Sequence, residues 1–219
     1  MLVSQLLNNN IPALSIHDKP ALALGLMDDY DILHLPVLSE EKFVGLISKE
    51  NLLDAEDGSI HLSDPILLQP LSVRPDEHFF TALRTIAAHE LSLLPVVNEQ
   101  QELQGVVLTA ELLKTLSVFL GNEDKGAVIV LETDKRNFSF GELSRLVETN
   151  DAYITQLNTY TEPSTGLVII TLKINKMEVS DVVATFQRYE YIVRYYFGEE
   201  EYANELKENY RHLISYLNM

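Results

Sequence analysis

The feature that most constrains the fold is an internal repeat in the first half of the chain. One copy runs from Leu14 to Leu53 and the other from Leu71 to Leu113, and each contains an apolar-Pro-Val run followed by Gly and two apolar residues. Serine, proline and glycine recur at similar separations, 21 and 9 positions in the first copy and 23 and 10 in the second. Because the differences in length fall where loops or helix ends belong, this self-similarity predicts two copies of one structural unit.

Each copy is predicted to fold as β-α-β-β-α. An extended stretch leads to a helix, and two short apolar β-rich runs joined by a polar turn precede a second helix. In the second copy the first helix is expected to begin at Pro75, because proline fits the first helical position and Asp76 and Glu77 favour the positive end of a helix. Pro36 and Pro95 lack a backbone donor, so each must lie at a sheet edge or a strand end.

The second half of the chain follows a polar, turn-rich linker at 121–126 and has a different pattern. A continuous apolar strand at 127–131 is followed by Ser139 and Glu142, which predict a capping box at the start of a helix. Residues 161–166 are a hairpin signal between two β-rich runs, after which a further helix and strand are expected. The order β-α-β-β-α-β predicts a ferredoxin-like sandwich.

The last segment, 199–219, is predicted to be an amphipathic helix. Its start is acidic, and its apolar stripe consists of Tyr202, Leu206, Tyr210, Leu213 and Leu217. Such a stripe needs a partner surface. The sequence leaves three open: the sheet of the second half, the first half of the chain, or another subunit.

The repeated pattern of the first half resembles a tandem pair of CBS motifs. The resemblance rests on an apolar-Pro-Val strand, a turn, Gly and two apolar residues, three variable places, then an acid or amide and Leu. In that family two motifs pack through their sheets into one module, whose clefts often take adenosine-containing ligands. The resemblance implies that Ser48 stands at the ligand-reading hydroxyl position and Asn51 where the family has Asp. In the second copy Leu108 replaces the hydroxyl and Glu111 replaces the Asp.

These four residues carry a ligand hypothesis and a plainer alternative. A hydroxyl donates to phosphate and a short carboxylate accepts from both ribose hydroxyls, so Ser48 suits a nucleotide, Asn51 suits it in part, and Leu108 does not. The ligand implied is an adenine nucleotide or S-adenosylmethionine. The plainer alternative makes Ser48 a helix N-cap and Glu111 an exposed acid in a first helical turn.

A short run in the second half resembles the Pro-Gly-x-Leu-x-x-Val signature of the ACT domain. Phe140 stands in place of the family's proline, Gly141 matches its glycine, and Leu146 replaces its valine. A glycine at a helix start lets a ligand carboxylate approach backbone N–H groups, so the resemblance implies an amino-acid site at Gly141. The alternative is that Gly141 serves only packing or the entry turn.

These patterns together predict an α+β chain of two modules and a terminal helix. The CBS pair is expected at 1–121, with repeats at about 1–58 and 59–121, the ACT-like domain at 127–198, and the helix at 199–219. The order CBS, CBS, ACT resembles the acetoin-utilisation protein B type of regulatory family.

The composition excludes several classes of function. With 16 Lys and Arg against 33 Asp and Glu the formal net charge is −17, which repels phosphate backbones and anionic lipid, so neither nucleic acid nor a membrane is expected as a partner. The absence of cysteine excludes disulfides, thiol nucleophiles and thiolate zinc sites. The start of the chain has no cationic signal-peptide region, and no window reaches the ~18 apolar residues of a membrane span. A cytoplasmic protein is therefore expected.

The sequence contains no recognised catalytic motif. It lacks a Gly-x-Gly-x-x-Gly run, a Walker loop, a Gly-x-Ser-x-Gly elbow and a His-Glu-x-x-His helix, and its six histidines do not pair at metal-ligand spacing. We therefore expect neither catalytic residues nor a metal site.

The sequence favours a regulatory function. We expect a protein that senses a small molecule, at the CBS cleft, the ACT-like domain or both, through the geometry of a homodimer or larger oligomer. The alternative is a protein-interaction or scaffolding module whose ligand clefts are vestigial, as the departures at Asn51, Leu108 and Phe140 allow.

Overall fold

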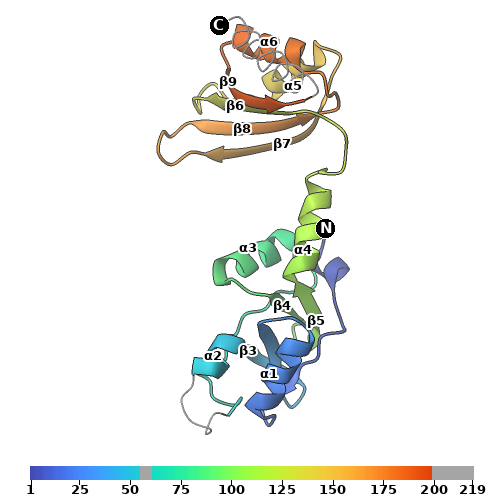
Figure 1. Ribbon diagram of the computed structural model, residues 1–219, viewed down its shortest axis with the longest axis vertical. Helices are drawn as coiled ribbons and strands as arrows, with labels where there is room; N and C mark the ends of the chain where they lie inside the picture. Colours follow the sequence, from blue (N-terminus) through green and yellow to red (C-terminus); the bar gives the residue numbers. More distant parts are fainter. Residues whose placement is uncertain (55–60, 199–219) are drawn as a thin grey trace, which may run out of the picture. The chain divides into compact units, whose positions relative to one another are not determined.

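The computed structural model describes residues 1–54 and 61–198, and the chain divides into two compact units, Met1–Leu116 and Ser117–Met219 (Figure 1). The terminal segment expected to be an amphipathic helix, 199–219, lies outside the described residues. Within the described part of the chain no helix is long and apolar enough to cross a membrane.

The first unit contains the two predicted copies of one motif. The elements of the first copy are β1 (Leu14–Ser15), α1 (Pro20–Asp29), β2 (His34–Ser39), β3 (Lys42–Ser48) and α2 (Lys49–Asp54). Those of the second are α3 (Phe79–His89), β4 (Leu93–Val97), β5 (Leu103–Leu108) and α4 (Thr109–Phe119), preceded by a single parallel bridge from Val73 to Val96 that takes the place of β1. A short 3-10 helix, η1 (Val3–Leu6), begins the chain. The β-α-β-β-α prediction is confirmed in both copies.

The two copies exchange flanking segments. The bridge from Asn8 to Val106 joins the start of the chain to the hairpin of the second copy. The bridge from Leu46 to Gln69 joins the segment between the copies to β3 of the first. Because each hairpin is extended by a segment that precedes the other copy, the two motifs form one unit with a continuous core.

The first helix of the second copy begins later than predicted. It starts at Phe79 instead of Pro75, with His78 as its N-cap. The backbone N–H of Arg74 donates to the Glu77 carboxylate at 2.8 Å, and that of Glu77 donates to the Arg74 carbonyl at 3.2 Å. These local bonds hold the proline and its two acids in a turn, so they precede the helix and do not open it.

The second unit is a four-stranded antiparallel sheet with two helices. Its elements are β6 (Val128–Thr133), α5 (Phe140–Glu148), β7 (Ile154–Thr161), β8 (Val168–Ile174), α6 (Ser180–Arg188) and β9 (Ile192–Phe197), and the strand order is β7-β8-β6-β9. Figure 1 shows α5 and α6 on the same side of this sheet. The predicted ferredoxin-like topology is confirmed.

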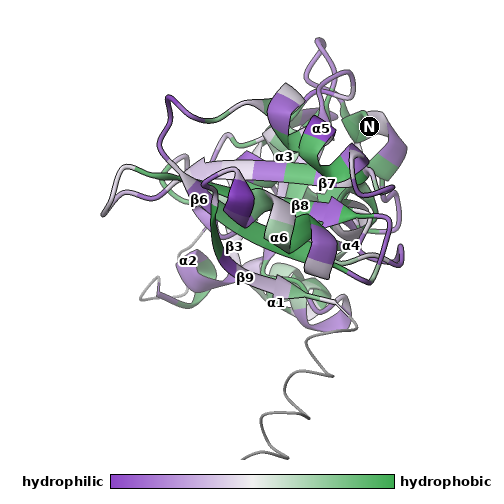
Figure 2. Cartoon of the chain, turned by 90° about the horizontal axis from the view of Figure 1, so that it is seen from above, coloured by the Kyte–Doolittle hydropathy of each residue, from purple (hydrophilic) through white to green (hydrophobic). Residues whose placement is uncertain are grey.

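The two faces of this sheet differ in what their buried residues contact. Hydrophobic and hydrophilic residues alternate along α5 and α6 (Figure 2), and their apolar sides pack with the inner sheet face in one core cluster. On the opposite face Val130 and Ile169 are buried but lie outside that cluster. The predicted capping box forms only in part: the Ser139 hydroxyl accepts the N–H of Glu142 at 3.4 Å, whereas the Glu142 carboxylate accepts the hydroxyl of Tyr191 at 2.8 Å.

Candidate functional site

A cleft of about 510 Å³ lies in the first unit beside the start of α2. Four segments line it: the start of β2, the junction of β3 and α2, the segment at Gln69, and the end of α3. The lining residues are Leu33, His34, Ser48, Lys49, Glu50, Asn51, Leu53, Asp54, Gln69, His89 and Glu90. Because both copies of the motif contribute, the cleft depends on their packing together.

Ser48 and Asn51, two of the predicted site residues, both line this cleft. Ser48 ends β3 and directly precedes α2, and its buried hydroxyl oxygen accepts the backbone N–H of Asn51 at 3.1 Å. The Asn51 side-chain NH₂ donates to the Leu67 carbonyl at 3.4 Å. The N-cap interpretation of Ser48 is therefore confirmed, and the Ser48 O–H and the Asn51 side-chain carbonyl are further hydrogen-bonding groups of two residues that line the cleft.

His34 lines the cleft, and its hydrogen bonds cross between the two copies. The backbone N–H of Ser92 donates to His34 Nδ1 at 3.2 Å, and the Ser92 hydroxyl lies 3.1 Å from the same nitrogen. The backbone N–H of Leu33 donates to that hydroxyl at 3.0 Å. Because Nδ1 is an acceptor, the neutral imidazole carries its proton on Nε2. Burial lowers the pKa of His34 below its usual value, which favours this neutral form.

Acidic side chains predominate around the cleft. Glu50, Asp54 and Glu90 are among the lining residues. The lining ammonium group, that of Lys49, lies 2.5 Å from the carboxylate of Asp28, so its charge is partly neutralised within the protein. The electrostatic environment therefore disfavours a ligand with several negative charges.

The second copy does not present the same groups. Leu108 is partly buried and packs against the core of the first unit, and the neighbouring hydroxyl of Thr109 donates to the Leu91 carbonyl at 2.7 Å. Glu111, the third predicted residue, lies in α4 and forms a 2.9 Å ion pair with Lys114, with its side chain 45% exposed. Glu111 does not line the cleft of Ser48, and its position fits the exposed first-turn acid of the plainer interpretation.

Gly141, the fourth predicted residue, belongs to the second unit, in the first turn of α5. A Cβ placed on it meets nothing within 4 Å, so packing does not require a glycine there. A polar cavity of about 380 Å³ lies beside its neighbours and is lined by Thr133, Arg136, Asn137, Ser139, Glu142, Tyr189, Glu190 and Tyr191. Within this cavity, burial and the hydrogen bond to the Glu142 carboxylate raise the pKa of Tyr191 to about 12, so Tyr191 stays a neutral donor.

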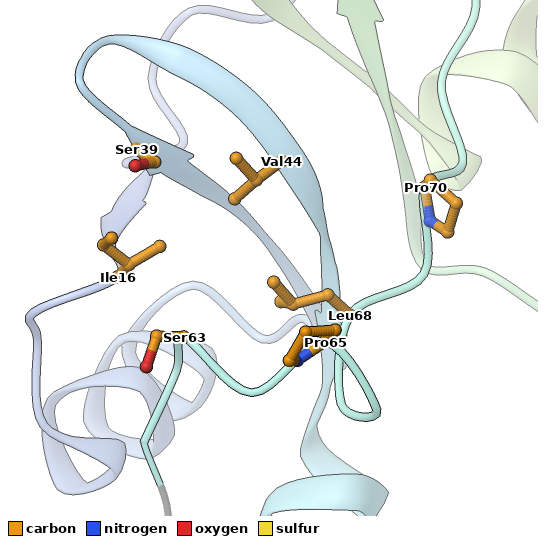
Figure 3. Close-up of a pocket in the computed structure, with 7 residues that line it drawn as sticks. All are labelled: Ile16, Ser39, Val44, Ser63, Pro65, Leu68 and Pro70. Carbon is orange, nitrogen blue, oxygen red and sulfur yellow. The ribbon is translucent and has the colours of Figure 1, made fainter.

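A third hollow, which we call the linker groove, has a volume of about 480 Å³ and lies in the first unit. It is lined by Ile16, Ser39, Val44, Ser63, Pro65, Leu68 and Pro70. Figure 3 shows Val44 on β3 and Leu68 on the segment between the two copies bordering the same space. None of these side chains was predicted from the sequence as a site residue, because no single motif contains them.

Other members of the cleft were also not predicted as site residues. His34, Gln69, His89 and Glu90 come from segments outside the Gly-apolar-apolar signature, and only the packing of one copy on the other brings them to Ser48. The sequence signal that could have indicated these residues is the repeat itself. Two copies that pack together bring the end of a helix in one copy close to the start of a strand in the other. Among residues 1–54 and 61–198, no cluster of three or more His, Cys, Asp or Glu side chains is arranged to hold a metal ion.

Comparison with known proteins relates the first unit to a known domain. The CBS domain model matches residues 3–58 and 63–118, just over half of the chain. An inosine-5'-monophosphate dehydrogenase from Korarchaeum cryptofilum is 32% identical over 98 residues, which are 45% of this chain and 21% of that protein. The chain thus matches only about a fifth of that relative's length.

Two solved structures are similar to part of this chain. A CBS domain pair/ACT domain protein from Thermotoga maritima has a TM-score of 0.50 and 25% identity, over 55% of this chain and 99% of that one. A putative acetoin utilization protein from Vibrio cholerae has a TM-score of 0.48 and 21% identity, over 57% of this chain and 98% of that one. Each match spans little more than half of this chain.

Proposed function

Because the chain belongs to the CBS domain family, through two tandem copies of the domain, we propose that it is a non-catalytic, ligand-responsive regulatory protein. CBS domain pairs typically bind adenosine-containing ligands in regulatory roles. We place such a ligand, an adenine nucleotide or S-adenosylmethionine, in the cleft of Ser48 and Asn51. The observation that carries this proposal is the meeting of these two side chains with residues of the other copy in one cleft of about 510 Å³.

The hydrogen-bonding capacity of the cleft suits the proposed ligand. The Ser48 oxygen already accepts the N–H of Asn51, so its O–H is free to donate to a phosphate or carboxylate oxygen of the ligand. The Asn51 side-chain carbonyl accepts one ribose hydroxyl, which is less than the two that a carboxylate accepts. The neutral His34, which also lines the cleft, carries an Nε2–H donor.

The charged side chains of the cleft predict an order of affinity among the proposed ligands. Glu50, Asp54 and Glu90 repel polyphosphates, and Lys49 is held by Asp28. S-adenosylmethionine, with its sulfonium and ammonium groups, meets attraction where a triphosphate meets repulsion. We therefore expect the order S-adenosylmethionine, then adenosine monophosphate, then ATP.

An amino-acid ligand is a second candidate, in the polar cavity of the ACT-like second unit. The Arg136 guanidinium suits a ligand carboxylate, and Glu142 and Glu190 suit an ammonium group. Gly141, one residue before Glu142, leaves open space beside the first turn of α5. A titration with free amino acids tests this candidate.

The regulatory output is proposed to be a change in the geometry of a homodimer or larger oligomer. A ligand shifts such an equilibrium only through different affinities for two states. The alternative, a scaffold with vestigial clefts, finds support in the second copy, where Leu108 packs into the core and the Thr109 hydroxyl is bonded within the protein.

Calorimetric titration of the wild type and three variants tests the proposal. Ser48→Ala removes a hydrogen bond to a charged ligand group, worth about 1.5 to 3 kcal/mol, so its Kd for S-adenosylmethionine or AMP should rise roughly tenfold or more. Ser48→Thr keeps the hydroxyl and should bind within a few-fold of the wild type. Glu111→Ala is the matched control, because Glu111 does not line the cleft.

Stability and affinity must be measured separately here. Ser48→Ala also removes the N-cap bond to Asn51, which costs about 0.5 to 2 kcal/mol of stability without any ligand. A thermal shift alone therefore does not separate the loss of affinity from the loss of stability, whereas a measured Kd reports the affinity. Tight nucleotide binding untouched by Ser48→Ala contradicts the residue assignment, and no binding by any protein favours the scaffold.

A further inference from the structure

We infer that the linker groove is a second ligand site, for a neutral and mostly apolar small molecule with one or two hydrogen-bonding groups. Its volume of about 480 Å³ is ample for a small organic molecule. Five lining side chains are aliphatic or proline, and the other two, Ser39 and Ser63, carry hydroxyls. The groove therefore offers apolar walls with a small number of polar groups, the usual composition of a small-molecule site.

The side chains that line the linker groove favour an uncharged ligand. None of the seven side chains is ionisable. A charged ligand entering the groove loses hydration without gaining an ionic partner from its walls, which is unfavourable. A neutral molecule loses less, and the hydroxyls of Ser39 and Ser63 offer a donor and acceptors for its polar group.

The groove is separate from the cleft, although one short segment borders both. Leu68 lines the groove and Gln69 lines the cleft, and the two sites share no residue. Gln69 exchanges two backbone hydrogen bonds with Leu46, of 2.7 and 2.9 Å, and so pairs with β3 through a single antiparallel bridge. Successive side chains point to opposite faces where the backbone pairs in this way, which explains why neighbouring residues border different sites.

The wall formed by this segment is held in place. Its backbone bonds to Leu46 fix it on β3, and Pro65 and Pro70, with their restricted backbone, stand on either side of Leu68. The absence of a Cβ at Gly45 permits the close approach, since a Cβ there falls 2.8 Å from Leu68 Cβ. A pre-formed wall lowers the ordering cost of binding.

This arrangement predicts coupling between the two sites, a step that rests on the proposed function of the cleft. Because Leu68 and Gln69 are adjacent in a segment that is held on β3, any shift that a groove ligand causes at Leu68 is carried to Gln69, and hence to the cleft. By linkage, the groove ligand and the cleft ligand must change each other's affinity by the same factor.

A fluorescence titration with N-phenyl-1-naphthylamine, a neutral apolar probe with one N–H donor, tests the groove in the full chain. Val44→Asp places a carboxylate on the wall, and Val44→Phe fills the space without a charge. Val44 is 37% exposed, so the variants should stay folded, which circular dichroism checks. Leu22→Asp is the matched control, because Leu22 is an exposed apolar residue of α1 outside the groove.

Saturable probe binding should weaken at least tenfold in both Val44 variants and stay unchanged in Leu22→Asp. Equal binding by all four proteins, or no saturable binding by the wild type, overturns the site. Coupling is measured as the Kd of S-adenosylmethionine with and without saturating probe, and an unchanged Kd overturns it. If S-adenosylmethionine does not bind at all, the coupling falls with the proposed function, while the probe titration still decides the groove.

Discussion

Two glycine-to-alanine substitutions in the first unit should have opposite effects on stability. At Gly45, in β3, an added Cβ falls 2.8 Å from Leu68 Cβ and 3.3 Å from the Gln69 carbonyl oxygen, both closer than ordinary van der Waals contact. The segment at Gln69 must move away by roughly half an ångström or more, which stretches its two bonds to Leu46. Overpacking of this kind costs about 1 to 3 kcal/mol.

Gly25 is the matched control for this substitution. It lies in the interior of α1, and an added Cβ meets nothing within 4 Å. Alanine there loses less backbone entropy on folding, so Gly25→Ala should stabilise the protein by about 0.5 to 1 kcal/mol. In Gly45→Ala the same entropic gain offsets part of the overpacking, which leaves a net loss of about 0.5 to 2 kcal/mol.

Urea denaturation followed by far-ultraviolet circular dichroism measures both effects. The midpoint for Gly45→Ala should fall and that for Gly25→Ala should rise, with the slope of the transition unchanged. The Kd for the cleft ligand should also change in Gly45→Ala, because Gln69 lines the cleft. A Gly45→Ala protein at least as stable as the wild type refutes the close approach of the two segments.

Two further predictions concern the contact between the copies and the oligomer. Burial lowers the pKa of His34 below its unfolded value of 6.5, so the unfolded chain takes up a proton at a higher pH than the folded chain does. The free energy of unfolding should therefore fall as the pH drops below about 6.5. His34→Gln should flatten this pH dependence, which urea midpoints measured from pH 7.5 to 5 would show. Equal slopes in the two proteins contradict a buried neutral His34. Light scattering should give at least twice the chain mass of 24.8 kDa, and a monomer at all working concentrations contradicts the oligomeric mechanism.

The repeat made the fold predictable, because it reports many positions at once. A single helix or strand is a weak signal, but the same order of elements occurring twice constrains both copies, and the structure has that order in each of them. In the second half, the hairpin signal at 161–166 and the helices placed between the strands predicted the ferredoxin-like order of elements. The predicted start of α3 was wrong because Pro75, Asp76 and Glu77 suit a turn as well as a helix start. The hydrogen bond from the Arg74 N–H to the Glu77 carboxylate favours the turn.

The candidate site was predictable only where one motif contains it. Ser48 and Asn51 belong to a local signature and were expected together, and the structure places them in one cleft. His34 was not predicted as a site residue, since its role depends on Ser92, 58 positions away. Contacts of that range arise from packing between the copies, for which a single sequence carries no direct signal.

The difference between the two copies argues for one adenosine-type ligand per chain. In the first copy the buried hydroxyl of Ser48 keeps a free O–H after capping α2, so a ligand can use it. In the second, Leu108 packs against the core, and the adjacent Thr109 donates its hydroxyl to the Leu91 carbonyl. A ligand there must break that bond and leave a carbonyl unpaired, at a cost of about 1 to 3 kcal/mol, before it gains a bond of similar strength. A calorimetric stoichiometry near one per chain is therefore expected for S-adenosylmethionine, and a value near two contradicts the argument from Leu108 and Thr109.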